Sequence, residues 1–205
     1  MTKPRVGIVC TSLSNYQSII RAFTWLEIDT IKIESPTDFK NVSHIVLPGV
    51  SAFGSLMKEL QQRDFLEQLE LSRSEGKPIL GLCAGMQVLG KQSEESEIRG
   101  LGWLDFECCK IDTKEIKGIR SFHTGWNDVA ITSKLLNVDE SNCFYFNHSY
   151  YATNAPEGIS SGKTSYGILF TSMVEKDNLI GAQFHPEKSQ AAGLNFLKKF
   201  SELKT

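Results

Sequence analysis

Short apolar stretches that alternate with helix-like stretches in the first half of the chain are the feature that most constrains its fold. The strand-like stretches are Val6–Cys10, Thr30–Ile33, His44–Leu47 and Pro78–Leu82. Between them, apolar residues at helical spacing occur in Ser18–Leu26, Ser55–Leu60 and Asp64–Leu71. Strands that are joined through helices lie parallel, and the helices then cover both faces of the sheet. The first half therefore predicts an α/β fold with a parallel central sheet flanked by helices.

The second half of the chain has strand-like stretches without regular helices between them. These stretches are Trp103–Ile111, Asn127–Ile131, Cys143–Asn147, Tyr166–Val174 and Leu179–Gln183. We expect them to be antiparallel or mixed strands added to the parallel core. A closing amphipathic helix is expected at Gly193–Leu203, with Leu194, Leu197 and Phe200 on one face. Because no repeat, low-complexity segment or linker divides the 205 residues, we expect one domain over residues 1–205.

Composition excludes several classes of protein. The formal net charge is -2 and the basic residues are scattered, whereas a nucleic-acid surface needs a concentrated basic patch. No stretch approaches the roughly 18 apolar residues of a membrane span, and the N-terminus lacks a signal-peptide pattern. The five cysteines are irregularly spaced and include no CxxC pair, which predicts neither a disulfide framework nor a zinc site. We expect a cytoplasmic protein that needs no metal and no cofactor.

Cys83 lies at the centre of the run PILGLCAGMQVLG, residues 78–90. The strand-like stretch Pro78–Leu82 ends at a turn of small residues, and a helix-like stretch begins directly after it at Met86. A thiol on such a turn lies above a helix N-terminus, where the helix dipole and free N–H groups stabilise a thiolate. The arrangement is analogous to the nucleophile elbow of serine hydrolases. The alternative is that Cys83 is a small buried residue of the core.

A cysteine nucleophile needs a base, a group that orients the base, and donors for the oxyanion. His185 directly follows a strand-like stretch, and Glu187 lies close enough to fix the tautomer of its ring. The alternative for this pair is a surface contact of little energetic value. The turn at Gly49 and Val50 offers backbone N–H groups near the same sheet edge, or it is an ordinary turn after a strand.

Three motifs in a fixed order resemble those of the class I, or triad, glutamine amidotransferases. They are LPGV at 47–50, GLCAGMQ at 81–87 and FHPEKSQ at 184–190. The resemblance implies a flavodoxin-like fold in which Cys83 attacks the side-chain amide of glutamine and forms a glutamyl thioester. Ammonia is released, and water then frees glutamate. His185 would be the general base and acid, and Glu187 the carboxylate that orients it.

The same resemblance implies where glutamine binds. The N–H groups of Val50 and Ala84 would be the oxyanion donors, with Gly49 in the same turn. Gln87 and the backbone of Ser149 and Tyr150 match positions that hold the substrate.

Two further segments narrow the resemblance. FHTGWN at 122–127 and NHSYY at 147–151 are similar to segments of the glutaminase subunit of imidazole glycerol phosphate synthase, an enzyme of histidine biosynthesis. That subunit forms a heterodimer with a (β/α)8-barrel cyclase, through which ammonia passes to the acceptor. The resemblance places His123, Trp126 and Asn127 at the partner interface, whereas residue type alone leaves Trp126 equally compatible with an ordinary core position.

The chain departs from the usual family pattern at three places. Where DYGxGNLxS is usual after the first strand, this chain has CTSLSNYQS at 10–18, and Ser51 replaces the last glycine of PGVG. Ala84 replaces the usual leucine after the nucleophile. These departures leave two alternatives open: a paralogue that supplies ammonia for amidation of a surface-polysaccharide sugar, and a non-catalytic subunit that only binds a partner. A related cysteine peptidase or γ-glutamyl hydrolase is a third, against which residues 122–127 and 147–151 argue.

Overall fold

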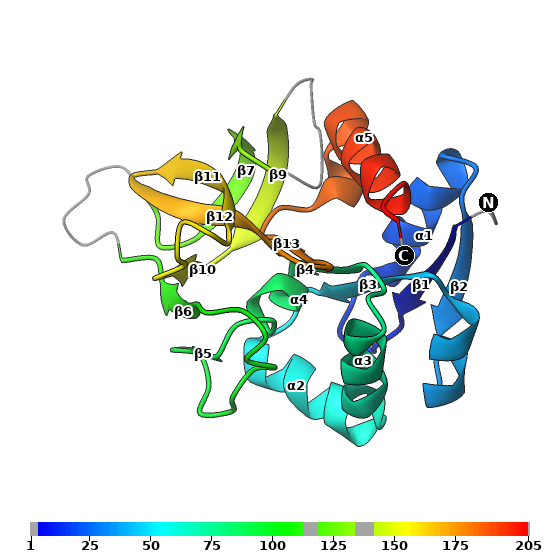
Figure 1. Cartoon of the computed structure of the whole chain (residues 1–205). Coiled ribbons are helices and arrows are strands. Elements are labelled where there is room, and N and C mark those ends of the chain that lie inside the picture. The colour runs from blue at the N-terminus through cyan, green and yellow to red at the C-terminus, as the bar shows by residue number, and fades with distance from the viewer. Residues whose placement is uncertain (1–3, 113–118, 134–141, 205) are drawn as a thin grey trace.

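Eleven strands form one mixed sheet through the centre of the molecule in the computed structural model (Figure 1). The structure describes residues 4–112, 119–133 and 142–204. The strand order is β2-β1-β3-β4-β13-β12-β10-β6-β5, with β11 paired to β12 and β8 paired to β11. The strands are β1 (Arg5–Val9), β2 (Asp29–Ile33), β3 (His44–Gly49), β4 (Ile79–Cys83), β5 (Gln92–Ser93), β6 (Glu107–Lys110), β8 (Ala130–Ile131), β10 (Tyr150–Thr153), β11 (Ser160–Tyr166), β12 (Ile168–Lys176) and β13 (Leu179–Ala182).

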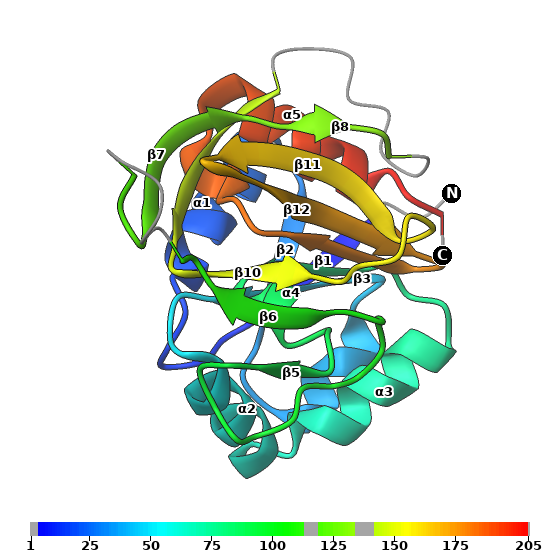
Figure 2. The ribbon, with the colours of Figure 1, turned by 90° about the vertical axis from the view of Figure 1, so that its left-hand side faces the viewer.

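The strands of the first half pair in parallel, as the alternating pattern predicts. β1 pairs in parallel with β2 and β3, and β4 pairs in parallel with β3 and β13. Every residue of β3 and β4 is buried, which is why these strands are continuous apolar runs rather than alternating ones. From β13 onward the pairing becomes antiparallel, through β12 and β10 to β6 (Figure 2). The expected α/β fold with added antiparallel strands is confirmed.

Helices cover both faces of the sheet (Figure 1). One face carries α1 (Tyr16–Trp25) and α5 (Gln190–Ser201), and the other carries η1 (Pro36–Asn41), α2 (Phe53–Gln62), α3 (Phe65–Ser74) and the single turn α4 (Ala84–Gln87). α5 buries Phe196, Leu197 and Phe200 at helical spacing. No helix in the described part of the chain is long and apolar enough to span a bilayer.

A separate two-stranded sheet lies beside α5 and consists of β7 (His123–Asp128) and β9 (Cys143–His148). The two strands are antiparallel, and His123 lies opposite His148. β9 packs onto the rest of the molecule through Phe144 and Phe146, which contact the ring of Phe184 at centroid distances of 4.0 and 5.9 Å. This sheet forms a second wall next to the carboxyl ends of the parallel strands.

Several expected element boundaries differ in the structure. The helix after Cys83 ends at Gln87, although the apolar residues continue. The carbonyl groups of the next residues accept hydrogen bonds from the loop at 101–104 instead of continuing a helix, with Leu101 N–H donating to Val88 O at 2.7 Å. In the expected strand Trp103–Ile111, only β6 is extended and paired.

Three strands, β5, β10 and β11, were not expected, and one helix begins early. β5 and β11 consist almost entirely of polar residues and glycine, and β10 is only four residues long, so none of the three contains an apolar stretch that would predict a strand. The final helix begins at Gln190 rather than Gly193 because the preceding turn, η2 (Pro186–Lys188), leads directly into it.

Candidate active site

The carboxyl ends of three neighbouring parallel strands meet at one edge of the sheet. Gly49 at the end of β3 lies opposite Cys83 at the end of β4, and Ala182 at the end of β13 lies opposite Leu82. The chain that leaves β13 reaches His185 three residues later. Ligand sites in open α/β sheets form at this edge. The strand order therefore brings together three motifs that are far apart in the sequence.

Cys83 has a strained backbone conformation on the strand-to-helix turn. Its φ of 54° and ψ of -112° lie in a region that non-glycine residues rarely adopt, at a cost on the order of 1–3 kcal/mol. The turn is tight because α4 packs directly on β3: a Cβ atom at Gly85 would overlap the carbonyl oxygen of Leu47. Such strain at a sharp turn is how a nucleophile elbow holds its side chain at the sheet edge.

His185 and Glu187 form a buried pair beside Cys83. His185 Nδ1 is 2.9 Å from Glu187 Oε1, and the two side chains are 4% and 2% exposed. Burial opposes the charged ring, but the Cys83 thiol and the Glu187 carboxylate outweigh burial and raise the pKa of His185. Within the described residues, His185 Nε2 has no partner that satisfies strict hydrogen-bond geometry. The ring is therefore oriented by Glu187 and placed to hold the proton that a thiol must release to become a nucleophile.

The turn that carries this pair is fastened to β9. His185 N–H donates to the Tyr145 carbonyl at 2.8 Å, and the Ser189 hydroxyl donates to the His185 carbonyl at 2.6 Å. The same hydroxyl accepts the Tyr145 N–H at 2.9 Å. Gly193 is required on the other side, since a Cβ atom there would overlap the Pro186 carbonyl oxygen. The imidazole position is thus set by backbone contacts from two elements.

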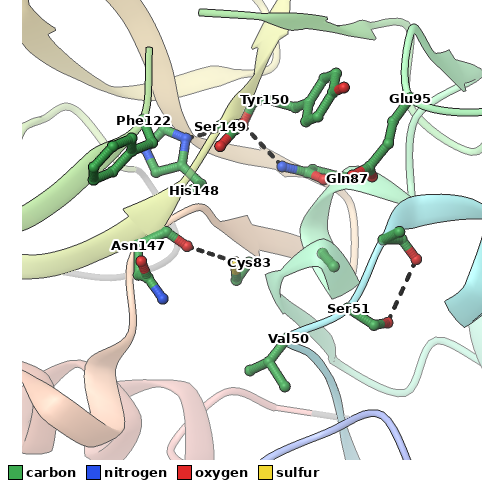
Figure 3. Close-up of a pocket in the computed structure, with 12 residues that line it drawn as sticks. Val50, Ser51, Cys83, Gln87, Glu95, Phe122, Asn147, His148, Ser149 and Tyr150 are labelled. Carbon is green, nitrogen blue, oxygen red and sulfur yellow. Dashed lines mark hydrogen bonds between the residues drawn. The ribbon is translucent and has the colours of Figure 1, made fainter. Parts of the chain in front are cut away.

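The Cys83 thiol has two further sulfur contacts. Its Sγ donates to the Asn147 carbonyl at 3.8 Å, and it accepts the side-chain amide of Gln183 at 3.7 Å. Gln183 is fully buried and directly follows β13. The sulfur is thereby held between the parallel strand ends and β9 (Figure 3).

The N–H of Val50, expected as an oxyanion donor, is directed away from the thiol. It donates to the Leu13 carbonyl at 3.2 Å. The loop that carries Leu13 is anchored to α2, because Glu59 accepts the backbone N–H of Ser12 at 2.7 Å and its hydroxyl at 3.1 Å. The N–H of Ala84 belongs to the first turn of α4, where backbone donors have no partner within the helix. In this conformation one of the two expected donors is thus occupied.

A cavity of about 370 Å³ opens beside Cys83 (Figure 3). It contains the expected residues Val50, Ala84, Gln87, Ser149 and Tyr150. The remaining lining residues, besides Cys83, are Ser51, Ala52, Glu95, Phe122, Asn147 and His148. Gly49 instead lines a much smaller adjacent cavity next to His185 and Glu187.

Hydrogen bonds within the cavity wall limit what each residue can offer a ligand. The side-chain nitrogen of Gln87 donates to the Tyr150 carbonyl at 3.0 Å and to Gln183 Oε1 at 3.1 Å. Its amide oxygen is therefore the group available to a ligand. The Tyr150 carbonyl also accepts from His148, and the Ser149 carbonyl accepts the N–H of Ile111. What this segment can offer a ligand is therefore its N–H groups and the Ser149 hydroxyl, not the Tyr150 carbonyl.

A family model for glutamine amidotransferase class-I matches residues 11–202. This chain belongs to the class I glutamine amidotransferase family. Among its curated relatives are proteins named imidazole glycerol phosphate synthase subunit HisH. The relative from Sulfurimonas denitrificans is 38% identical over 96% of this chain and 97% of its own length, and that from Geobacter sulfurreducens is 34% identical over the whole of both chains.

Solved structures agree with the amidotransferase fold. The structure of PurLQS from Thermotoga maritima has a TM-score of 0.76 at 16% identity, covering 97% of this chain and 98% of the other. A structure titled as a glutamine amidotransferase has a TM-score of 0.72 at 16% identity, covering 95% and 98%. In the described part of this amidotransferase, no group of three or more His, Cys, Asp or Glu side chains is placed to hold a metal ion.

Six lining residues of the amidotransferase cavity were not expected there, among them Glu95, Phe122 and His148. Gln183, which contacts the sulfur, was not expected at the site either. Glu95 is the one carboxylate among the described lining residues, and its Oε2 also accepts the N–H of Phe53 at the start of α2 at 2.7 Å. It lies in a polar stretch without a motif, so the sequence has no signal for it. Phe122 and His148 lie within motifs that predict an interface and a substrate-binding backbone. Gln183 is two residues before His185, a spacing that places two side chains on the same side of a strand.

The three residues expected at a partner interface differ in exposure. Trp126 is 48% exposed, which excludes the core position that its residue type also allowed. Its ring contacts Tyr145 at a centroid distance of 6.1 Å. Asn127 is half-buried, and the side chain of His123 is 2% exposed, on the inner face of β7. Trp126 is thus the member of this set whose side chain is at the surface of the amidotransferase.

Proposed function

We propose that this chain is the glutaminase subunit of an imidazole glycerol phosphate synthase, which hydrolyses glutamine to glutamate and ammonia for histidine biosynthesis. The observation that carries the proposal is the Cys83 thiol on a strained turn, beside a buried imidazole that a carboxylate orients. The names and full-length similarity of the curated relatives support this subunit over a sugar-amidating paralogue. The assembled cysteine, histidine and glutamate argue against a subunit that only binds a partner.

In the proposed reaction, Cys83 Sγ attacks the side-chain carbonyl carbon of glutamine after His185 has taken the thiol proton. The C–N bond breaks, His185 returns a proton to the leaving nitrogen, and ammonia and a glutamyl thioester form. His185 then removes a proton from water, which attacks the thioester and frees glutamate and the thiol. Glu187 keeps Nδ1 protonated, so that Nε2 faces the sulfur in each step.

The cavity has groups that complement the ends of glutamine. Glu95 is placed to attract the α-ammonium group, and the Gln87 amide oxygen can accept a hydrogen bond from it or from the side-chain amide. The backbone N–H groups at Ser149 and Tyr150 are suited to the α-carboxylate. Val50 and Ala84 would supply the oxyanion donors once the Val50 N–H leaves the Leu13 carbonyl. We therefore expect weak glutamine hydrolysis by the isolated subunit.

The proposed partner is a (β/α)8-barrel cyclase that binds over β7, where Trp126 is the exposed anchor. Asn127 and His123 lie on the same strand with their side chains on its inner face. Ammonia would pass directly from the cavity to that partner in a heterodimer. We further propose that residues 1–205 act as one glutamine amidotransferase domain in the cytoplasm. The five free cysteines support a reducing compartment.

The test is glutamate release from glutamine, measured for the subunit alone and with an imidazole glycerol phosphate synthase cyclase. We expect release that rises when the cyclase and its ligand are added, and that Cys83→Ala abolishes. Cys109→Ala is the matched control, because Cys109 lies on β6 outside the cavity. Glutamate release that persists in Cys83→Ala would refute the proposed chemistry. Failure of every cyclase complex to make the imidazole product would refute the proposed pathway.

A further inference from the structure

A chain of hydrogen bonds runs from the outer strand β7 into the cavity wall, toward Cys83. It links Asn127, His123, His148 and the Tyr150 carbonyl. We propose that Asn127, His123 and His148 are positioning residues. Every hydrogen bond between them donates in the same direction, toward the Tyr150 carbonyl, and this holds that carbonyl and the Gln87 amide in the orientation that binds glutamine. The inference rests on the proposed glutaminase function, but its structural part can be tested without it.

The direction of the chain is set first at its inner end. A carbonyl oxygen can only accept, and the Tyr150 carbonyl lies 2.9 Å from His148 Nδ1. His148 Nδ1 therefore carries a hydrogen. Burial lowers the pKa of His148 to about 3 and that of His123 to about 4, so both rings are neutral at physiological pH. In a neutral ring with Nδ1 protonated, Nε2 is an acceptor.

The second link follows from the first. His148 Nε2 lies 3.1 Å from His123 Nδ1, and since the former accepts, the latter must donate. His123 is therefore also protonated at Nδ1, which makes its Nε2 an acceptor. The ring has little freedom to turn over, because it is stacked between Phe146 and Tyr166 at centroid distances of 4.5 and 4.2 Å. Both tautomers thus follow from one carbonyl group.

The outer end of the chain requires the same direction independently. Asn127 Oδ1 accepts the backbone N–H of Asp128 at 2.8 Å, which fixes which end of the amide faces inward. Its Nδ2 then donates to His123 Nε2 at 3.2 Å and to the Ser165 carbonyl at 2.9 Å. A donor at Asn127 is what an acceptor at His123 Nε2 needs. The Tyr150 carbonyl and the Asn127 amide, at opposite ends of the hydrogen-bond chain, thus require the same donor direction independently.

The chain meets the site at the Tyr150 carbonyl, which accepts from both His148 and Gln87. The second N–H of Gln87 donates to Gln183, and the amide of Gln183 donates to Cys83 Sγ. The amide oxygen of Gln87 faces the cavity only while the Tyr150 carbonyl stays in place to accept its N–H. A reversed or charged histidine pair would take a donor from that carbonyl or add a charge behind it.

The test variant is Asn127→Asp, which has the same shape, keeps the acceptor for the Asp128 N–H and replaces the donor toward His123 by an acceptor. Its matched control is Asp29→Asn, the opposite exchange at an exposed position at the start of β2, which is the far edge strand of the main sheet. Glutamine KM and kcat are measured in the complex with the cyclase, and ring tautomers by ¹⁵N NMR of the histidine side chains. Thermal unfolding shows whether each variant is folded.

We expect the unmodified protein to show His123 and His148 as neutral rings protonated at Nδ1. In Asn127→Asp we expect His123 to gain a proton at Nε2 and the glutamine KM to rise about fivefold, the effect of one weakened hydrogen bond, with a smaller change in kcat. Asp29→Asn should change neither. A ring protonated at Nε2 alone in the unmodified protein, or an unchanged glutamine KM in folded Asn127→Asp, would overturn the inference. Absence of glutamate release from the unmodified complex would refute the proposed function instead, while the NMR result would still decide the tautomers.

Discussion

The two walls of the cavity are built in different ways. The wall made by the ends of β3 and β4 consists of fully buried apolar strands, tight glycine contacts and one strained residue, Cys83. The wall made by β7 and β9 has stacked aromatic rings and two buried histidines in a hydrogen-bond chain. In the first wall the backbone fixes the reacting atom, and in the second the side chains fix the orientation of polar groups. Changes at the first wall and its triad should therefore affect chemistry, whereas changes at the second should affect binding and pH dependence.

The largest expected effect comes from the base and its carboxylate. His185→Gln should lower kcat for glutamate release by about 10³-fold, and Glu187→Gln by about 10²-fold, because a general base and its fixed tautomer are lost. Release is measured in the cyclase complex. Glu70→Gln is the matched control, since its carboxylate is half exposed and pairs with Arg73 on α3. A near-normal kcat in His185→Gln would show that the wall made by the ends of β3 and β4, with His185 and Glu187 beside it, is not a catalytic site.

The second effect is on stability and involves the two histidines of the wall made by β7 and β9. Burial lowers the pKa of His123 to about 4 and of His148 to about 3, whereas both would take up a proton near pH 6.5 in the unfolded chain. Between pH 6.5 and 4 the unfolded state therefore binds more protons, and the free energy of unfolding should fall as the pH falls. Burial also lowers the pKa of His44 at the start of β3, which adds to the same effect. His185 has the opposite shift, so its stabilising contribution is complete below pH 6.5 and adds no slope in this window.

Urea unfolding at a series of pH values measures this slope. Each histidine that stays neutral in the fold contributes up to about 1.4 kcal/mol per pH unit. His123→Gln should flatten the curve by roughly one proton. An identical slope in the variant would mean that His123 is protonated in the folded protein, which would contradict the neutral pair.

A third prediction separates strain from chemistry at Cys83. Cys83→Gly and Cys83→Ala both remove the thiol, but glycine adopts positive φ without strain and alanine does not. The glycine variant should therefore be more stable than the alanine variant by about 1 kcal/mol, the reverse of the order at an ordinary strand end. Chemical denaturation of the two inactive variants gives the difference. A more stable alanine variant would show that the turn is not strained.

The smallest expected effect is at Ser51. The Val50 N–H must leave the Leu13 carbonyl before it can face the thiol. A side chain at position 51 narrows the backbone freedom of the same turn, which has to adjust when the Gly49–Val50 peptide rotates. Ser51→Gly should raise glutamate release by the isolated subunit about threefold and change release in the cyclase complex less. Ser55→Gly, on α2, is the control for adding glycine nearby. Equal release with and without Ser51 would mean that this residue does not limit the rotation.

Much of the first wall could be predicted from the sequence. Buried parallel strands are continuous apolar runs, so β3 and β4 are visible as patterns, and the ends of β4 and β13 place Cys83 and His185 at one edge. The strained φ of Cys83 and the hydrogen bond from Val50 N–H to Leu13 could not be predicted, because both depend on contacts between loops that are distant in the sequence.

The second wall was harder to predict. The buried positions of β11 include the polar residues Ser161 and Thr164, and β10 is only four residues long, so hydrophobic periodicity marks neither strand. Motif similarity indicated an interface for His123, but its buried position opposite His148 depends on the pairing of β7 with β9. Glu95 enters the cavity through a turn with no sequence signal at all. Contacts between polar side chains on neighbouring strands can be predicted only once the register of the two strands is known.

The central claim is that Cys83 Sγ is the atom that attacks glutamine. It is tested most directly by treating the cyclase complex with a glutamine-analogue electrophile and locating the adduct by peptide mass spectrometry. We predict one adduct, on Cys83, that forms in step with the loss of glutamate release and is slowed by added glutamine. An adduct on Cys109 or Cys143, the two partly exposed cysteines, or inactivation without any adduct on Cys83, would contradict the account.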